Sequence, residues 1–198
     1  MKTTFVLGMT LLAAASSASF VAAQEKAASP AGTSATQIGE KGPWIEITAG
    51  RPIKRGRDLW GTGANYGKTL NPSAPVWRAG ADVSTRLKTE APLQIGGKSV
   101  PAGEYSLFID PKSPTDWTLV VSSWGAKKSG QDPAKDALWG AYNYTPAKDV
   151  ARVPMAVGAM PLAVDQLTWN FADVTSSGGK LVLIWDKVIA TAPFSVQK

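Results

Sequence analysis

Apolar and polar residues alternate with a period of two in the second half of this chain, and this pattern restricts its fold more than any other feature. The alternation runs through residues 105–109, 117–121 and 167–171. Because successive side chains of a β-strand point to opposite faces, each run would bury one face and expose the other. Two further strands are expected at 181–185, which is apolar on both faces, and from about 188 to 194. The pattern therefore predicts an all-β domain.

Glycine and proline residues between these runs indicate tight turns. Gly96 and Gly97 separate residues 93–95 from 98–100, a spacing typical of a two-residue hairpin turn with positive φ. The Pro-Ala-Gly sequence at 101–103 turns the chain again. Many short strands joined by such turns favour an antiparallel architecture. We predict a single antiparallel β-sandwich with jelly-roll-like connections.

The N-terminal residues have the features of an export signal. A positive start, an apolar run at 5–12 and small residues up to Ala23 are typical of a secretory signal peptide, which we assign to residues 1–23. Residues 24–42 are rich in Ala, Ser, Thr, Gly and Lys without apolar periodicity, which indicates a disordered linker. The β-sandwich domain then comprises residues 43–198. We expect an exported protein, periplasmic or extracellular, that does not span the membrane.

The sequence contains no cysteine and no histidine. Disulfides, thiol chemistry and Ser-His-Asp triads are therefore excluded, as are imidazole ligands for zinc, copper or iron. No calcium-loop motif occurs, so neither a cofactor nor a metal is expected. Loss of Lys2 with the signal peptide lowers the formal net charge from +6 to +5. The charges are scattered, so we expect weak attraction to anionic polymers but no nucleic-acid interface.

The most unusual stretch is residues 77–82, Trp-Arg-Ala-Gly-Ala-Asp. Arg78 and Asp82 are close enough to pair across a bend at Gly80, where glycine tolerates backbone angles that other residues avoid. Two interpretations of this pair stay open. It either lines a ligand cleft or braces a loop as a structural ion pair.

Aromatic and basic residues near glycines supply the remaining candidates. Trp60, Trp77 and Trp139 lie beside glycines or turns, where a tryptophan either packs into the core or stacks on a flat ligand or sugar ring. A basic cluster that includes Arg57 precedes Trp60 and would meet an anionic group unless it is only a solvated face. Gly140, within a strand pattern, indicates a bulge or a close approach by another group. The candidate ligand-binding residues are thus Arg57, Trp60, Trp77, Arg78, Asp82, Trp139 and Tyr142.

Four segments resemble a known family. Arg-Gly-Arg with Leu-Trp-Gly at 55–61, the stretch 77–82, Pro-Ala-Gly-Glu-Tyr-Ser-Leu-Phe at 101–108, and residues 139–153 are similar to the bacterial secreted proteins grouped as domain of unknown function 2911. The family's pattern reads Asn-Glu where this chain has Asp82 and Val83. The resemblance implies a β-rich exported domain and assigns no activity.

These observations favour a non-catalytic binding module of the cell envelope. Its partner would be an envelope glycan or an anionic small molecule, held by aromatic side chains and Arg78. A first alternative is a carboxylate-dependent hydrolase without histidine or cysteine, with Asp82 as one of two acid–base residues. A second alternative is a structural or assembly protein that offers its sheet edges to a partner.

Overall fold

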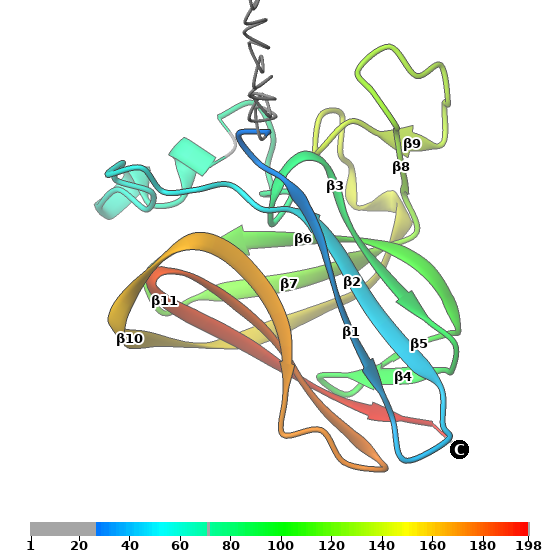
Figure 1. Ribbon diagram of the computed structural model, residues 1–198. Coiled ribbons are helices and arrows are strands. Elements are labelled where there is room, and N and C mark those ends of the chain that lie inside the picture. Colours follow the sequence, from blue (N-terminus) through cyan, green and yellow to red (C-terminus); the bar gives the residue numbers. More distant parts are fainter. Residues whose placement is uncertain (1–26, 71, 198) are drawn as a thin grey trace, which may run out of the picture.

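The computed structural model describes residues 27–70 and 72–197, and within them the chain is almost entirely β-structure (Figure 1). The strands are β1 (Ala31–Gln37), β2 (Trp44–Gly50), β3 (Ala81–Thr89), β4 (Leu93–Ile95), β5 (Lys98–Val100), β6 (Gly103–Pro111), β7 (Trp117–Ser122), β8 (Gly125–Ala126), β9 (Ala137–Leu138), β10 (Asp149–Ala172) and β11 (Gly178–Val196). Three short 3₁₀ helices are η1 (Gly63–Asn65), η2 (Lys68–Leu70) and η3 (Pro146–Lys148). The predicted all-β fold is confirmed. The signal peptide assigned to 1–23 lies outside the described residues.

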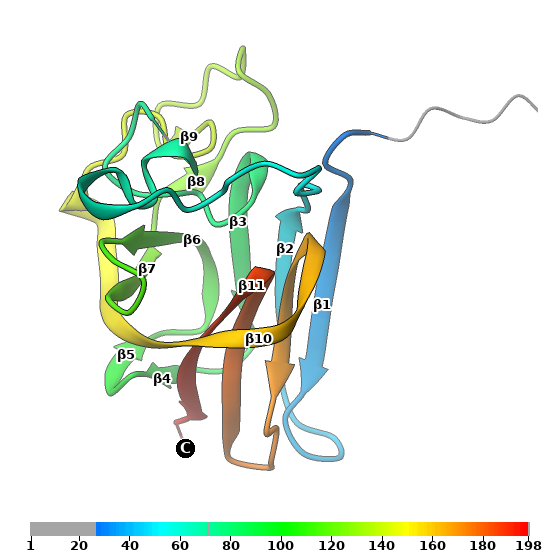
Figure 2. The same ribbon diagram turned by 90° about the vertical axis from the view of Figure 1, so that its left-hand side faces the viewer.

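Nine strands form one antiparallel sheet in the order β1-β2-β3-β6-β7-β10-β11-β4-β5. The long strand β10 bends, because its first part pairs with β7 and the rest pairs with β11. Its ladder with β11 is irregular between Ala159 and Thr168, as expected at a bend. The two halves of the sheet therefore face each other across the core (Figures 1 and 2). All nine strands are hydrogen-bonded in one sheet, so the division into two sheets of a jelly-roll-like sandwich stays a prediction.

The core lies between the facing halves and is rich in tryptophan. Trp117, Trp169 and Trp185, which the apolar pattern of the sequence placed inside, are only 1%, 3% and 3% exposed. Trp60 lies among Trp77, Trp117 and Trp185, with ring centroids 5.0 to 6.2 Å away. Large buried rings supply most of the apolar area that stabilises a domain without disulfides.

The predicted linker is wrong for residues 31–37, which form β1. This strand pairs with β2 from Ala31 opposite Gly50 to Gln37 opposite Trp44. Its residues are small and polar, so it shows no apolar alternation, and backbone hydrogen bonds at the edge of the sheet hold it instead. The domain therefore begins before residue 43.

The C-terminal prediction also needs correction. The two strands expected at 181–185 and from about 188 form one strand, β11, which continues through Asp186 in a left-handed conformation at φ 53°. The hairpin predicted around Gly96 and Gly97 is confirmed, because these residues join β4 to β5 with φ of 52° and 79°.

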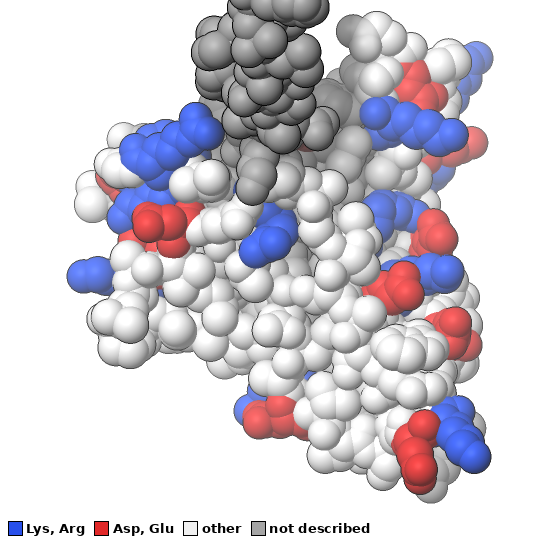
Figure 3. Space-filling view, in the orientation of Figure 1, with Lys and Arg blue, Asp and Glu red and all other residues white. Residues whose placement is uncertain are grey.

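The bend of β10 exposes an uncharged surface. Residues 156–164 contain no charged side chain, and Leu162 at their outer edge is 74% exposed. Figure 3 shows few charged side chains over the bent part of β10, whereas basic side chains gather over the segment that follows β2. The charge of this face is therefore uneven, and the segment after β2 leads to the candidate site.

Candidate functional site

The stretch that begins at Trp77 forms a loop anchored at both ends on strand β6. Trp77 exchanges two backbone hydrogen bonds with Ile109, of 2.7 and 2.8 Å, and Thr85 pairs with Leu107. Residues 78–84 thus lie opposite the single residue Phe108, six more than a regular antiparallel ladder requires. We call these seven residues the 78–84 loop. Its last residues, 81–84, are also the start of β3, where Ala81 pairs with Gly50 of β2, so the loop is attached to both neighbouring strands.

Interactions within the 78–84 loop hold an unusual backbone. Ala79 and Asp82 have positive φ, 52° and 61°, whereas Gly80, where the sequence predicted the bend, does not. The carbonyl oxygen of Ala79 accepts hydrogen bonds from Thr85 Oγ1 at 3.1 Å and from Trp169 Nε1 at 2.9 Å. At Gly80 there is instead no room for a side chain, because a Cβ there would lie 2.8 Å from Thr85 Oγ1.

The 78–84 loop forms one wall of a cleft, which we call the arginine cleft. Its volume is about 640 Å³, within the range of ligand pockets. The opposite wall is the segment after β2, and Trp77 and Trp185 contribute to the floor. The charged residues of the lining are Arg55, Arg57, Arg78, Asp58 and Asp82. Three arginines and two aspartates therefore line one cavity.

Arg78 does not form the side-chain ion pair with Asp82 that the sequence suggested. Within the described residues, its Nη1 instead donates to the backbone carbonyl of Asp82 at 2.8 Å. Its Cζ lies 5.8 Å from the centre of the Tyr142 ring, a cation–π arrangement. Gly140 permits this position, because a Cβ there would lie 2.6 Å from Nη1. The close approach predicted at Gly140 is therefore confirmed, and the approaching group is the Arg78 guanidinium.

The opposite wall is held by local hydrogen bonds. Arg57 donates from Nε to the carbonyl oxygen of Lys54 at 2.9 Å and from Nη2 to that of Ile53 at 2.8 Å. Asp58 Oδ1 accepts from the backbone N–H groups of Trp60 and Gly61, both at 3.2 Å. These contacts fix the position of a cation and a carboxylate before any ligand binds.

Two of the candidate tryptophans belong mainly to the core. Trp77 is 2% exposed and reaches the arginine cleft only as part of its floor. Trp60 is 9% exposed and lies behind that floor, so it does not line the cleft. Its Nε1 is buried without a hydrogen-bond partner in the described part of the chain. For Trp60 the core interpretation therefore holds.

Trp139 and Tyr142 lie in a different cavity, which we call the aromatic groove. It has a volume of about 420 Å³. The residues that give the groove its chemical character are Trp124, Lys127, Lys135, Trp139, Tyr142 and Asn143. The structure thus divides the seven candidates. Four line the arginine cleft, two line the aromatic groove and one is core, and the Arg78–Tyr142 contact joins the two cavities.

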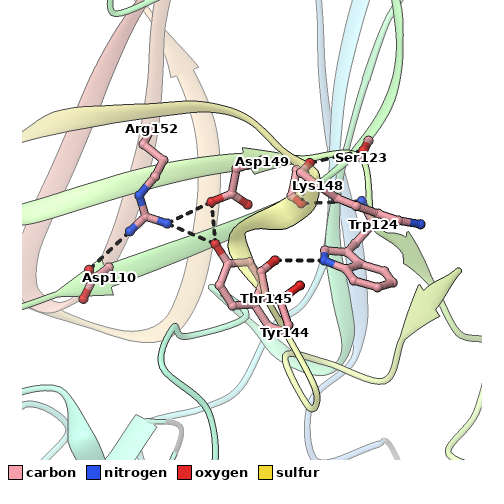
Figure 4. A network of polar contacts seen from close by, with 9 residues as sticks. Asp110, Ser123, Trp124, Tyr144, Thr145, Lys148, Asp149 and Arg152 are labelled. Carbon is pink, nitrogen blue, oxygen red and sulfur yellow. Dashed lines mark hydrogen bonds and ion pairs between the residues drawn. The ribbon is translucent and has the colours of Figure 1, made fainter.

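A polar network that the sequence did not indicate lies where β10 begins (Figure 4). Tyr144 donates its hydroxyl to Asp149 Oδ2 at 2.6 Å, and Arg152 Nη1 donates to the same oxygen at 2.9 Å. Arg152 Nη2 also reaches Asp110 Oδ2 at 3.4 Å. Burial, followed by the hydrogen bond and charge of Asp149, raises the pKa of Tyr144 well above its ordinary value. The network therefore fixes the chain after the aromatic groove, and it keeps Tyr144 protonated.

The described residues contain no group of carboxylates placed to hold a metal ion. Nor does any helix among them have the length and apolar character needed to cross a membrane. The groups available to a ligand are therefore guanidinium and ammonium groups, carboxylates, amides and aromatic rings.

Comparison with known proteins gives one family. The model described as protein of unknown function (DUF2911) matches residues 29–194. The chain belongs to this family. The match includes β1, in agreement with the earlier start of the domain. No curated protein and no solved structure matches the chain.

Among the cleft residues, sequence reasoning missed Asp58 and assigned Trp185 to the core alone. Asp58 directly follows Arg57, and a carboxylate two residues before a backbone N–H is typical of a tight turn. That signal predicts its hydrogen bonds but not the cavity beside it. Trp185 was assigned to the core because it ends a run that is apolar on both faces, and only the fold shows that it also lines the arginine cleft.

Proposed function

We propose that this protein is an exported, non-catalytic binding module of the cell envelope, and that its arginine cleft binds a polar ligand carrying an anionic group. The observation that carries the proposal is the convergence of Arg55, Arg57 and Arg78 on one cavity with a tryptophan floor. A guanidinium group can donate two parallel hydrogen bonds to a carboxylate, sulfate or phosphate. Export rests on the signal peptide expected at residues 1–23.

The other residues of the arginine cleft define the remainder of the ligand. Asp58 and Asp82 supply carboxylate oxygens, which accept hydrogen bonds from hydroxyl groups. They would repel a ligand composed only of anionic groups. The cleft therefore suits a ligand that combines an anionic group with hydroxyl groups.

The test is thermal stabilisation by a panel of candidate anions. Oligosaccharides of uronic acids, sulfated oligosaccharides, inorganic phosphate and an uncharged oligosaccharide are each added to the protein, and the melting temperature is measured. A ligand at one hundred times its Kd stabilises the folded state by about 2.7 kcal/mol. We expect a shift with at least one anionic oligosaccharide and none with the uncharged one.

Variants then locate the binding. Arg78→Gln and Arg57→Gln each remove one guanidinium group of the arginine cleft, and both should abolish the shift. Lys98→Gln removes the same charge from an exposed side chain of β5 and should preserve it. Equal effects of all three variants would mean that net charge alone attracts the ligand. No shift with any anion would refute the proposed function.

A hydrolase is the second candidate, because Asp58 and Asp82 line the same cavity. Two carboxylates on either side of a glycosidic bond are sufficient for acid–base hydrolysis. The two functions differ in what happens to a bound oligosaccharide. If products accumulate with the wild type but not with Asp82→Asn, the protein is a hydrolase. If the oligosaccharide is recovered intact, the binding function holds.

A further inference from the structure

We propose that the aromatic groove is a second subsite, which binds a sugar ring of the same acidic oligosaccharide whose anionic group lies in the arginine cleft. This inference rests on the proposed function and deepens it, because it assigns the ligand to the acidic oligosaccharides. It also requires more than one sugar unit, one for each cavity.

Exposed aromatic rings are the first observation. The core rings of Trp117, Trp169 and Trp185 are almost fully buried, whereas Tyr142 is 42% exposed and Trp139 is half-buried. Both line the aromatic groove. Apolar surface left in water costs free energy that a bound partner would recover. The C–H face of a sugar ring is apolar and flat, so it packs well against such rings.

Two rings of the groove, those of Trp124 and Tyr142, also have fixed partners before a ligand arrives. Trp124 donates from Nε1 to the carbonyl oxygen of Thr145 at 3.1 Å, and the ammonium group of Lys148 lies 4.2 Å from the centre of its ring. Tyr142 has the Arg78 guanidinium over its ring. Side chains with fixed orientation lose little conformational entropy on binding, which favours specific recognition.

Polar groups around the rings match the hydroxyl groups of a sugar. Asn143 offers an amide donor and acceptor, and Lys127 and Lys135 offer ammonium donors. The pairing of β8 with β9 holds these segments together through hydrogen bonds from Gly125 to Asp136 and from Lys127 to Leu138, both 2.9 Å long. A groove with several aromatic rings and a few polar groups is the usual composition of a small-molecule site.

Arg78 connects the two subsites. Its side chain lines the arginine cleft while its guanidinium lies against Tyr142, which lines the aromatic groove. The guanidinium lies directly against Gly140, where a Cβ would come within 2.6 Å of Nη1. An oligosaccharide that extends from the arginine cleft across Arg78 therefore enters the aromatic groove.

The experiment compares a short and a long probe by calorimetry. The probes are galacturonic acid and its linear tetrasaccharide, and the proteins are wild type, Tyr142→Ala and Trp139→Ala. The control is Trp44→Ala, which removes an aromatic ring that is 43% exposed at the start of β2, outside both cavities. All variants are first checked for an unchanged melting temperature without ligand. If Tyr142→Ala fails this check, Tyr142→Leu replaces it.

We expect the groove variants to weaken binding of the tetrasaccharide about tenfold, which corresponds to about 1.4 kcal/mol. Their affinity for the monosaccharide should not change. Trp44→Ala should affect neither probe. If the groove variants bind the tetrasaccharide as tightly as the wild type does, the second subsite is refuted while the arginine cleft stands. If the groove variants weaken binding of both probes equally, the second subsite is refuted as well, because the groove then acts only through Arg78. If the wild type binds neither probe, both this inference and the assignment of the ligand to acidic sugars are overturned.

Discussion

Replacement of Gly140 by alanine separates the cost of a backbone conformation from the cost of displacing Arg78. Gly140 has φ of +62°, and an alanine in this left-handed region costs about 1–2 kcal/mol. Alanine also lowers the conformational entropy of the unfolded chain, which stabilises the folded state by about 0.4–1 kcal/mol. The backbone effects together therefore predict a net decrease in stability of about 1 kcal/mol. The new Cβ would lie 2.6 Å from Arg78 Nη1 and 3.0 Å from Cζ. The guanidinium must therefore leave its position.

Displacement of Arg78 has its own cost. The side chain loses its hydrogen bond to the Asp82 carbonyl, and a charged donor contributes about 1.5 kcal/mol at the lower end of its range. It also loses the contact with the Tyr142 ring, worth about 0.5–1 kcal/mol at an exposed site. Because Arg78 is half-buried and water replaces part of these contacts, we expect a total loss of about 2–3 kcal/mol for Gly140→Ala.

Gly97→Ala is the matched control. Gly97 has φ of +79° in the β4–β5 turn, and a Cβ there would meet nothing within 4 Å. This variant should lose only the backbone term, about 1 kcal/mol. Both free energies of unfolding are measured by urea titration with a shared slope. If the two variants lose the same stability to within about 0.5 kcal/mol, Arg78 is not held at Gly140 and the proposed link between the two cavities is lost.

Three further outcomes are expected. Trp185→Ala should lower the free energy of unfolding, measured by urea titration, by about 3–5 kcal/mol, because the buried Trp185 ring packs against Trp77. A decrease below about 1 kcal/mol would contradict the place of Trp185 in the core. Burial and Asp149 raise the pKa of Tyr144, so the stabilisation that its protonated hydroxyl gives is complete below pH 10 and falls as the pH rises further. The free energy of unfolding of Tyr144→Phe should therefore decrease less than that of the wild type as the pH is raised above 10. If the two free energies decrease in parallel, this linkage is excluded. A metal chelator should leave the melting temperature unchanged, and a clear decrease would point to an oxygen-ligated ion.

Alternation predicted the strands that bury one face against the core. The hairpin at Gly96 and Gly97 was equally clear, because its turn requires positive φ at both positions. Strand β1 was not predictable in this way, since its small polar residues are held by backbone pairing with β2 at the edge of the sheet. Propensity also could not show that β11 continues through Asp186, because that residue is held there by tertiary structure, including a 2.6 Å ion pair with Lys54.

Most residues of the candidate site were predictable from the sequence, but their arrangement was not. The residue types around Trp77 and Arg78 indicated an unusual loop, and the glycine in the strand pattern indicated a close approach at Gly140. The partner of Arg78 could not be inferred, because a sequence shows carboxylates but not the direction of a backbone carbonyl such as that of Asp82. The division into two cavities depends on contacts between segments more than fifty residues apart, such as Ser84 with the carbonyl oxygens of Leu138 and Gly140.

The anchoring of the 78–84 loop has a consequence for protein engineering. Trp77 is fixed to Ile109 and Thr85 to Leu107, so the register of β6 with its neighbour is set on both sides of the loop. The positions of the loop that can be varied are its exposed ones, such as Asp82, because Ala79, Gly80 and Ser84 are buried. A replacement loop also has to keep the pairing of Ala81 with Gly50 of β2 and the hydrogen bond that the Ala79 carbonyl accepts from Trp169. The hydrogen bonds of Ser84 to the carbonyl oxygens of Leu138 and Gly140 have to be kept as well. The domain can thus serve as a scaffold in which a randomised segment between two fixed ends supplies new binding specificities.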